Sequence, residues 1–331
     1  MRAVMVIHVK RITSRMPTES VSMNLSRRDF LKFAGATTAT AALTTLPAKA
    51  EAGEFFTGHP DRKGILVDTS LCIGHNCRRC EFACAKENHL PTPDKPPEDA
   101  SVFDQRRRTH PDQFTVINRF PGRTEDLPVY AKKQCMHCDE PACASACLVG
   151  AFKKTPEGAV SYDASVCIGC RYCMVACPFD IPTYEYNSAL HPRVRKCTFC
   201  FETRLKEGKA PACVEACPRE VMTFGQREDL IKVARNKIAR NPDKYVDHVY
   251  GEHEVGGTCW MYLSPVPFDS IGMRTDLGTT PYPELTRNYL SAAPLVMAIW
   301  PSFFLTLYLF SKRKDQIAAE RNGKHKKEEQ A

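Results

Sequence analysis

The sequence lacks the short motifs by which many enzymes hold a nucleotide or activate a nucleophile. Its 331 residues contain no phosphate-binding loop, no glycine fingerprint for a dinucleotide, and no recognisable pairing of a nucleophile with a base. These absences leave no set of residues that is able to transform a substrate. We therefore expect no catalytic residues in this chain.

The middle of the chain has almost no net charge. The net charge of +8 comes from the two ends: residues 1–50 contain eight basic and two acidic residues, and residues 311–331 contain seven basic and four acidic residues. Subtracting these contributions of +6 and +3 leaves a net charge of −1 for residues 51–310. The basic balance therefore belongs to segments that direct membrane topology, and no nucleic-acid partner is expected.

Long uncharged runs are also scarce, and the clearest, Tyr289–Phe310, lies near the C-terminus. Because roughly 20 apolar helical residues span a bilayer, it predicts one transmembrane helix in contact with lipid over residues 289–311; a buried core helix is the alternative. Lys312, Arg313 and Lys314 follow directly. Positive residues stay on the cytoplasmic side, so the basic tail, residues 312–331, is expected in the cytoplasm and residues 51–288 outside it.

The N-terminal region carries an export signal. Arg27 and Arg28 precede a mildly apolar run that ends in Ala48-Lys49-Ala50, an A-x-A cleavage pattern. A chance basic dipeptide and a core helix are the alternatives, but they fit this order of features poorly. Residues 1–50 are thus predicted to be an N-terminal extension and twin-arginine signal peptide, which places the protein at the inner membrane with its main domain in the periplasm. The start codon, Met1 or Met23, and cleavage of the signal are left open.

Cysteine, by contrast, is abundant, with 17 in the chain. One run has Cys167, Cys170, Cys173 and Cys177 closed by Pro178, which is the C-x2-C-x2-C-x3-C-P spacing of bacterial ferredoxins. In such a run three thiolates bind one 4Fe-4S cluster and the fourth binds its neighbour. Paired disulfides, a zinc site and a buried cysteine-rich helix are the alternatives. Zinc ligands usually come from separated pairs, and a twin-arginine substrate folds before it meets an oxidising compartment, so iron-sulfur binding is favoured.

The same kind of motif occurs four times. The second, third and fourth motifs start at Cys135, Cys167 and Cys197, about thirty residues apart, as in a repeated supersecondary unit. The four motifs use sixteen of the seventeen cysteines and leave Cys259, which we interpret as a small buried hydrophobic residue. The sixteen candidate iron ligands are Cys72, Cys77, Cys80, Cys84, Cys135, Cys138, Cys143, Cys147, Cys167, Cys170, Cys173, Cys177, Cys197, Cys200, Cys213 and Cys217.

Short strand-like segments lead into the motifs. Strands are expected at residues 65–68, 129–134, 158–163 and 258–264, and a helix at residues 228–240. A proline-rich, charged insert, which includes the run FDQRRRTHPD, separates the first motif from the second. The expected fold class is α+β: tandem bacterial ferredoxin-like repeats with loop insertions over residues 51–288, plus one C-terminal transmembrane helix. Clusters should supply much of the folding energy.

Three runs carry a resemblance to a known family: AKKQCMHCDEPACASAC, VCIGCRYCMVACPFDIP and YGEHEVGGTCWMYL. With the signal and the single C-terminal anchor, they make residues 51–310 resemble the periplasmic four-cluster iron-sulfur subunits of membrane-bound redox complexes. These belong to the ferredoxin family of the dimethyl sulfoxide reductase beta subunit. The resemblance is to the iron-sulfur subunit of hydrogenase-2-type nickel-iron hydrogenases and to the similar subunit of the high-molecular-weight cytochrome complex.

The resemblance implies four 4Fe-4S clusters that exchange ligands between motifs, the first with the fourth and the second with the third. Cluster 1 would be held by Cys72, Cys77, Cys80 and Cys217, cluster 2 by Cys84, Cys197, Cys200 and Cys213, cluster 3 by Cys135, Cys138, Cys143 and Cys177, and cluster 4 by Cys147, Cys167, Cys170 and Cys173. Every cluster then has its full set of thiolates, which leaves no open iron to act as a Lewis acid.

The first motif departs from the family pattern, because four residues instead of two separate Cys72 from Cys77. His75 stands where the second cysteine would fall. A two-residue bulge with Cys77 as the ligand is favoured over ligation by His75 or a damaged site, although histidine replaces cysteine in some clusters. Leu148 stands where a proline usually follows the fourth cysteine.

Several cations adjoin the candidate ligands and are able to raise cluster potentials. For most of them, a solvated surface charge is the favoured interpretation. His137, inside the second motif, is interpreted as a loop residue. The cations are Lys132, Lys133, Arg171, Arg195 and Lys196.

The resemblance implies an electron-transfer subunit without a substrate-converting site of its own. Its expected partners are catalytic hydrogenase subunits or a multihaem cytochrome on the extracytoplasmic side and an integral membrane subunit that interacts with quinone, as in anaerobic respiration. The alternatives are the electron-transfer subunit of a molybdopterin-type reductase for polysulfide or dimethyl sulfoxide, and a cluster-bearing redox sensor. Spacing leaves the direction of electron flow open, because such clusters range from roughly −700 to +450 mV.

Overall fold

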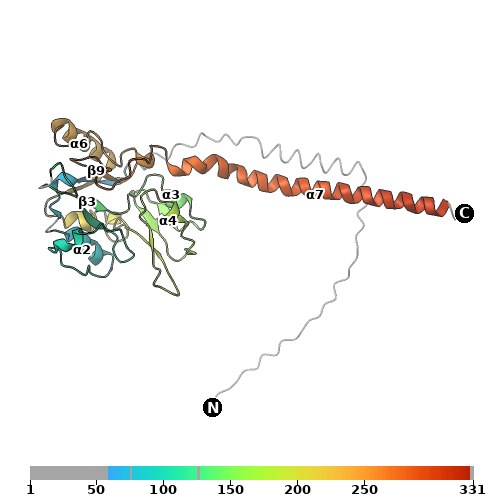
Figure 1. Ribbon diagram of the computed structural model, residues 1–331, viewed down its shortest axis with the longest axis horizontal. Helices are drawn as coiled ribbons and strands as arrows, with labels where there is room; N and C mark the ends of the chain where they lie inside the picture. Colours follow the sequence, from blue (N-terminus) through green and yellow to red (C-terminus); the bar gives the residue numbers. More distant parts are fainter. Residues whose placement is uncertain (1–58, 75–76, 125–126, 329–331) are drawn as a thin grey trace, which may run out of the picture. The chain divides into compact units, whose positions relative to one another are not determined.

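The computed structural model describes residues 59–74, 77–124 and 127–328, with side chains described as far as residue 322 (Figure 1). The chain divides into two units, Met1–Phe55 and Phe56–Ala331, and only the second contains described residues. The expected signal peptide and His75 lie outside the described residues.

A three-stranded sheet forms the centre of the domain. β1 (Lys63–Asp68) lies between β8 (Met222–Gln226), to which it is antiparallel, and β9 (Trp260–Leu263), to which it is parallel. The register pairs Leu66 with Thr223 on one side and with Met261 on the other. All residues of β1 after Lys63 are buried, as expected for a strand that is covered on both faces.

Alternate side chains of this sheet enter two different cores. On one face, helix α6 (Arg227–Arg240) packs its apolar stripe of Leu230, Ile231, Ala234 and Ile238 against Leu66, Met261 and Leu263. On the other face, Ile65, Val67, Trp260 and Tyr262 join a larger cluster that contains Cys80 and Cys213. The sheet therefore separates an apolar core from the side on which candidate ligands lie.

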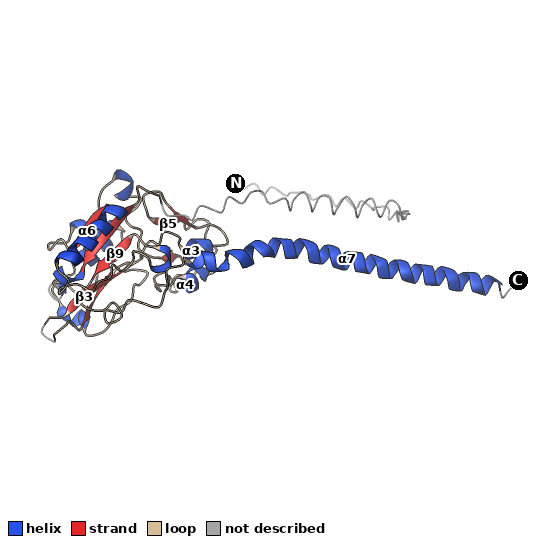
Figure 2. Cartoon of the chain, turned by 90° about the horizontal axis from the view of Figure 1, so that it is seen from above, coloured by secondary structure: helices blue, strands red, loops and turns tan. Residues whose placement is uncertain are grey.

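Three hairpins and four short helices make up most of the remaining described domain (Figure 2). The hairpins are β2 (Val116–Phe120) with β3 (Val129–Lys133), β4 (Phe152–Lys154) with β5 (Val160–Tyr162), and β6 (Thr183–Tyr184) with β7 (Val194–Arg195). The helices are α2 (Arg79–Glu87), α3 (Ala142–Ser145), α4 (Tyr172–Ala176) and α5 (Ala212–Glu215). Single 3-10 turns occur at η1 (Thr69–Leu71), η3 (Ala100–Phe103), η4 (Leu205–Glu207) and η5 (Glu254–Gly256).

The predicted elements are confirmed, but others were not predicted. The four expected strands are β1, β3, β5 and β9, and the expected helix is α6. The unpredicted strands β2, β4, β6, β7 and β8 are two to five residues long. Strands this short have a weak local pattern and depend on their partner strand, which lies in the same hairpin for β2, β4, β6 and β7 and far away in the sequence for β8.

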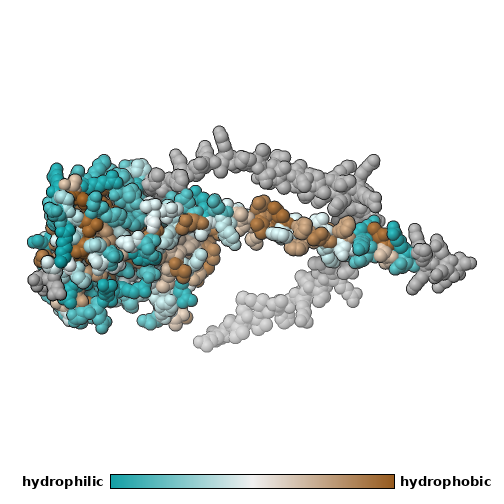
Figure 3. Space-filling view, turned by 45° about the horizontal axis from the view of Figure 1, so that its top comes forward, coloured by the Kyte–Doolittle hydropathy of each residue, from teal (hydrophilic) through white to brown (hydrophobic). Residues whose placement is uncertain are grey.

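Helix α7 (Tyr282–Glu328) is the one helix of the described residues that is long and apolar enough to cross a membrane, judged by length and composition. The predicted span of residues 289–311 lies inside it, but the helix begins earlier and continues through most of the basic tail. Its apolar side chains are exposed (Figure 3). Pro294 and Pro301 lie inside it without ending it, as is common in membrane helices, where other groups satisfy the backbone carbonyls that a proline leaves free.

Candidate iron-sulfur sites

The cysteine loops contain residues with left-handed backbone. Positive φ occurs at His137 (50°), Gly169 (70°), Arg171 (61°), Phe199 (61°) and Cys200 (49°). Left-handed residues in a loop are able to turn neighbouring N–H groups toward one point and so form a concavity that binds anions. Some of these N–H groups already donate to cysteine sulfur: Gly169 N to Cys167 Sγ at 3.4 Å and Phe199 N to Cys197 Sγ at 3.4 Å. The loops therefore suit a negatively charged cluster.

The first and fourth motifs meet at one cavity. Cys72, Cys77, Cys80 and Cys217 line it together with Val67, Ile117, Tyr130 and Met222. Helices α2 and α5 pack against each other, which brings Cys217, just after α5, to the cysteines of the first motif. Gly74 is part of this arrangement, because a Cβ there would lie 1.9 Å from Cδ1 of Tyr130. No other residue fits at that position without moving the tyrosine.

The second and third motifs meet at another cavity. Cys135, Cys138, Cys143 and Cys177 line it with Val160, Phe179 and Ile181. Helices α3 and α4 are neighbours, and Cys177 is the C-terminal capping residue of α4. The exchange of one cysteine between paired motifs is therefore the same in both cavities.

The remaining eight candidate ligands form two groups. Burial raises the pKa of Cys84, and the thiolates of Cys197, Cys213 and Cys200 lie close enough to raise it further. Burial also raises the pKa of Cys173 to about 11, with contributions from Cys167, Cys170 and Cys147. The four groups coincide with the four ligand sets that the family resemblance implies. Their occupation by iron stays a prediction.

The spacing within the groups suits a cluster better than a single ion. Among the described residues, no three histidine, cysteine, aspartate or glutamate side chains converge closely enough to hold one metal ion. A zinc site needs its sulfurs about 2.3 Å from one metal. The four cysteines of a cubane instead bind four separate iron atoms, so their sulfurs stand farther apart.

Comparison with known proteins points to the same chemistry. Residues 128–227 match the 4Fe-4S dicluster domain, and residues 24–44 match the TAT (twin-arginine translocation) pathway signal sequence. A protein of Nitratidesulfovibrio vulgaris is 51% identical over 297 residues, which cover 89% of this chain and 80% of that protein. The hydrogenase-2 operon protein HybA of Escherichia coli O157:H7 is 36% identical over 287 residues, which cover 75% of this chain and 84% of HybA.

The chain belongs to the HybA family of iron-sulfur subunits. The iron-sulfur subunit of the nitrate-inducible formate dehydrogenase of Escherichia coli K12 is a further relative, 35% identical over 206 residues that cover 60% of this chain and 66% of that subunit. The predicted family, the iron-sulfur chemistry and the role in electron transfer without catalysis are thereby confirmed. The signal match likewise confirms a twin-arginine signal, which implies export to the periplasm.

Burial dominates the electrostatics of the candidate ligands in this HybA-family chain. It raises the pKa of Cys143 and Cys197 to about 12 and that of Cys72, Cys177 and Cys200 to about 11. Free thiols in these places would stay protonated at neutral pH. Since iron binds thiolate, the metal itself must compensate for the cost of ionising them, which couples folding to cluster binding.

Two of the cations beside the ligands are buried, so the interpretation as solvated surface charge is wrong for them. Lys132 is 6% exposed and Lys196 is 5% exposed. Burial lowers the pKa of Lys132, but the thiolates of Cys213, Cys80 and Cys197 outweigh that effect and raise it. The Lys132 ammonium donates to Gln134 Oε1 at 3.0 Å and lies 4.4 Å from the ring centroid of Trp260.

Lys196 occupies a comparable place at the second pair of motifs. Its Nζ donates to Val160 O at 2.5 Å and to Cys197 O at 3.1 Å, and its charge lowers the pKa of Cys143 against the larger effect of burial. A positive charge near the ligands stabilises the reduced form of a cluster, which is the more negative form. Strand β3 and the residues after β7 thus place one buried cation beside each pair of motifs. The sequence indicated that both lysines adjoin the ligands, but it did not reveal that they are buried.

His137 is more than a loop residue. It is fully buried, accepts a hydrogen bond at Nδ1 from Val160 N at 2.9 Å, and stacks on Phe199 with ring centroids 4.8 Å apart. Burial, followed by the charges of Lys196, Lys154 and Lys132, holds its pKa well below the usual range. The neutral ring therefore joins the second motif to the fourth as a packing element.

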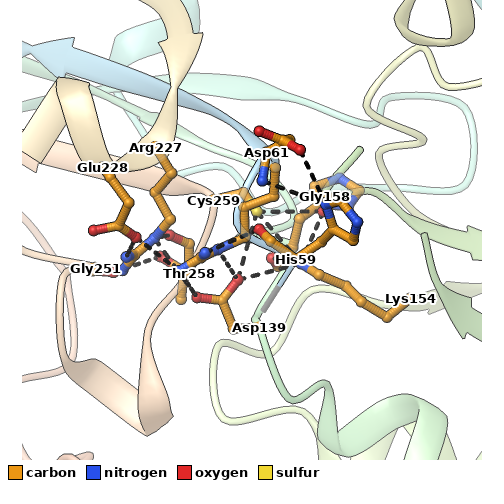
Figure 4. Close-up of polar contacts among 12 residues, drawn as sticks. His59, Asp61, Asp139, Lys154, Gly158, Arg227, Glu228, Gly251, Thr258 and Cys259 are labelled. Atoms are coloured by element: carbon orange, nitrogen blue, oxygen red, sulfur yellow. Dashed lines mark hydrogen bonds and ion pairs between the residues drawn. The ribbon is translucent and has the colours of Figure 1, made fainter. Parts of the chain in front are cut away.

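A buried ionic network centred on Asp139 anchors the second motif to the rest of the domain (Figure 4). Asp139 directly follows Cys138 and is 2% exposed. Its carboxylate accepts from Arg62 Nη2 at 3.2 Å and lies 3.6 Å from Arg227 Nε and 3.5 Å from Lys154 Nζ. Gly257 makes room for it, because a Cβ there would lie 3.0 Å from Asp139 Oδ2.

Cys259, outside the four motifs, adjoins this network. It is completely buried, as expected, but it also has polar neighbours. Lys154 Nζ donates to its sulfur at 3.3 Å, and the thiol donates to Gly158 O at 3.3 Å. Its backbone N–H donates to Met136 O at 3.1 Å. The residue therefore belongs to the scaffold behind the second motif.

Proposed function

We propose that the sixteen motif cysteines hold four 4Fe-4S clusters in tandem ferredoxin-like repeats. The observation that carries this proposal is the pair of cavities that are each lined by four cysteines from two motifs. The ligand sets are those given above, with Cys77 in cluster 1. The anion-binding loops and the buried lysines support the same assignment.

The chain then serves as a wire between an extracytoplasmic partner and a membrane partner. A bound 4Fe-4S cluster accepts and releases single electrons. The protein contributes ligation by cysteine, the exclusion of water by apolar walls such as Trp260 and Phe199, and positive charge at Lys132 and Lys196. A hydrogenase or a multihaem cytochrome is the proposed electron partner, and a quinone-linked membrane subunit is the proposed second partner.

The relatives favour a hydrogenase over a molybdopterin-type reductase as partner. The HybA match covers 75% of this chain, whereas the match to the formate dehydrogenase subunit covers 60%. The larger coverage of HybA supports a hydrogenase as the partner. A molybdopterin-type reductase is the alternative, and the experiment with different substrates below distinguishes the two.

The cluster 4 group faces a patch that suits the membrane partner. Cys170 is exposed, and the exposed fractions of Leu148, Ile168 and Val175 around its motif are 82%, 63% and 81%. The first part of α7 lies beside α3, and Figure 3 shows apolar surface on the side of the domain where α7 begins. We propose that this patch docks on the membrane subunit.

The proposed topology has α7 crossing the inner membrane with its C-terminal end in the cytoplasm. The charges after the apolar segment, Lys312, Arg313 and Lys314, support this orientation. A reporter that works only outside the cytoplasm should be active when fused after Gly256 and inactive when fused after Lys314. Activity at the second position would contradict the orientation.

The conduit role is tested with Cys170→Ala in the assembled complex. Electron flow from the catalytic partner to quinone should fall to background, because one ligand of cluster 4 is lost, while the partner keeps its activity with an artificial acceptor dye. Asn236→Ala is the control, since it truncates an exposed side chain of α6 that is far in the sequence from the cysteine motifs. Loss of dye-linked activity from a complex that still assembles would refute the conduit role. Hydrogen, formate and polysulfide as substrates of the same preparation separate the candidate partners.

A further inference from the structure

A basic cleft lies beside the proposed clusters and is not used by them. It has a volume of about 310 Å³ and runs between the first and second cysteine cavities, sharing Lys132 with one and Met136, Phe179 and Ile181 with the other. Six cations line it against a single carboxylate, Asp180. The cations are Arg106, Arg107, Arg108, Lys132, Lys133 and Arg274.

Three of these cations already have strong partners. Arg107 Nη2 donates to Glu81 Oε1 at 2.6 Å, Arg274 Nη2 donates to Asp276 Oδ2 at 2.8 Å, and Lys132 donates to Gln134. These contacts fix the walls of the cleft. In particular, buried Glu81 holds the insert that carries the three consecutive arginines against α2.

The other three cations have weaker partners in the described part of the chain. Arg106 lies 5.0 Å from the ring centroid of Phe120, and Arg108 donates to the backbone O of Asp180 at 3.2 Å, but no described ion pair joins either of them, or Lys133, to a carboxylate. Like charges that crowd together in this way favour an anionic ligand.

The floor of the cleft is apolar. Phe120, Met136, Phe179, Ile271 and Met273 line the cleft together with the cations. A small inorganic anion would use the cations and leave this floor empty. A peptide segment that presents carboxylates together with an apolar side chain would use both.

We propose that this cleft receives an acidic segment of the extracytoplasmic electron partner, with aspartate or glutamate side chains facing Arg106, Arg108 and Lys133. The inference rests on the proposed role as an electron relay. Docking here would place the partner beside two clusters at once, on a patch different from the apolar one around Cys170. Complementary charge at an interface mainly sets the rate of encounter and the choice of partner.

The test uses the complex purified from its native membrane through a tag on this chain. Arg106→Glu with Arg108→Glu reverses two exposed charges and should lower the amount of partner retained at moderate salt by about tenfold or more, because electrostatic steering contributes that much to association. The matched control is Arg240→Glu with Lys244→Glu, which makes the same charge change at exposed residues outside the cleft. It should retain the partner.

Equal retention in the cleft variant and wild type, or equal loss in the control, would overturn the inference. Lys133→Gln provides a second, milder variant and should weaken retention in the same direction. A photo-crosslinker at position 108 should form a crosslink to an acidic segment of the partner. Crosslinks to lipid or to this chain alone would overturn the inference. The inference would also be overturned if inorganic phosphate abolished the crosslink while the partner stayed bound to the complex. Iron content and reduction by dithionite, measured on each variant, should be unchanged, which separates failure of docking from failure of the relay.

Discussion

Arg62 Nη2 lies 3.2 Å from Asp139 Oδ2, although 77 positions separate the two residues in the chain. Both side chains are buried. Asp139 directly follows Cys138, so the ion pair ties the start of the domain to a candidate ligand loop. Together with Arg227 and Lys154, it holds the second motif against β1, α6 and β9.

Removal of this carboxylate should destabilise the domain. In Asp139→Asn, Lys154 loses its described counter-ion, and Arg62 and Arg227 keep only the half-exposed Glu228. Breaking a buried ion pair in this way typically costs about 3–5 kcal/mol of unfolding free energy. Anaerobic chemical denaturation of the iron-loaded protein should show this loss. Asp229→Asn breaks the exposed pair with Lys232 and should leave the free energy of unfolding nearly unchanged, because solvent screens the pair. Similar losses in both variants would show that the network does not stabilise the domain.

The first motif makes a prediction about iron content. The proposed four clusters require about sixteen iron atoms per chain, and Cys77→Ala should lower the number to about twelve, because Cys77 lines the first cavity with Cys72 and Cys80. His75→Ala should keep the full number. Quantitative iron analysis with spectroscopy of the reduced clusters provides the measurement, and the opposite pattern would assign the ligand role to His75.

Lys132 should raise the reduction potentials of clusters 1 and 2, which the first and fourth motifs are proposed to hold. Its charge acts on Cys80, Cys197 and Cys213, so Lys132→Met should lower the reduction potentials of clusters 1 and 2. A unit charge close to a partly buried site contributes a few kcal/mol, which corresponds to a shift on the order of 100 mV. Redox titration followed by paramagnetic resonance measures it. Lys153→Met removes an exposed charge and should leave the potentials within about 20 mV of wild type, because solvent screens it; unchanged potentials in Lys132→Met would contradict the assignment.

Iron removal should expose a dependence on pH. Since burial raises the pKa of Cys143 and Cys197 to about 12, the folded apoprotein holds these thiols protonated. The unfolded chain ionises them near the ordinary value, so their contribution to stability is present below about pH 9 and is lost as pH rises toward 12. The denaturation midpoint of the chelator-treated protein should therefore fall over this range, while the iron-loaded protein changes less. An apoprotein midpoint that rises over this range would contradict the burial of these thiols.

The same apoprotein should be alkylated unevenly. Thiolate is the nucleophile, so the buried Cys143 and Cys197 should react more slowly at pH 8 than the exposed Cys170. Mass spectrometry of partially alkylated protein measures the difference, and denaturant should abolish it. Equal rates before denaturation would show that these sites are open without iron.

Part of the local structure was determined by the sequence. Cysteine spacing indicated iron-sulfur binding, because the chemistry of a cluster depends on short distances along one loop. Alternating and helical patterns predicted β1, β3, β5, β9 and α6, since each buries a face with the matching period. The long uncharged run predicted a membrane-length helix, because length and apolarity are properties of composition.

What depended on distant contacts was decided only by the tertiary structure. Sequence spacing is the same for a solvated lysine and for Lys132, which is buried because β9 places Trp260 over it. Asp139 meets Arg62 only after β1, the second motif and α6 have packed together. The basic cleft forms because Glu81 draws the insert with its arginines toward α2. Burial and charge pairing depend on which segments meet in space, and no local pattern in the chain encodes that by itself.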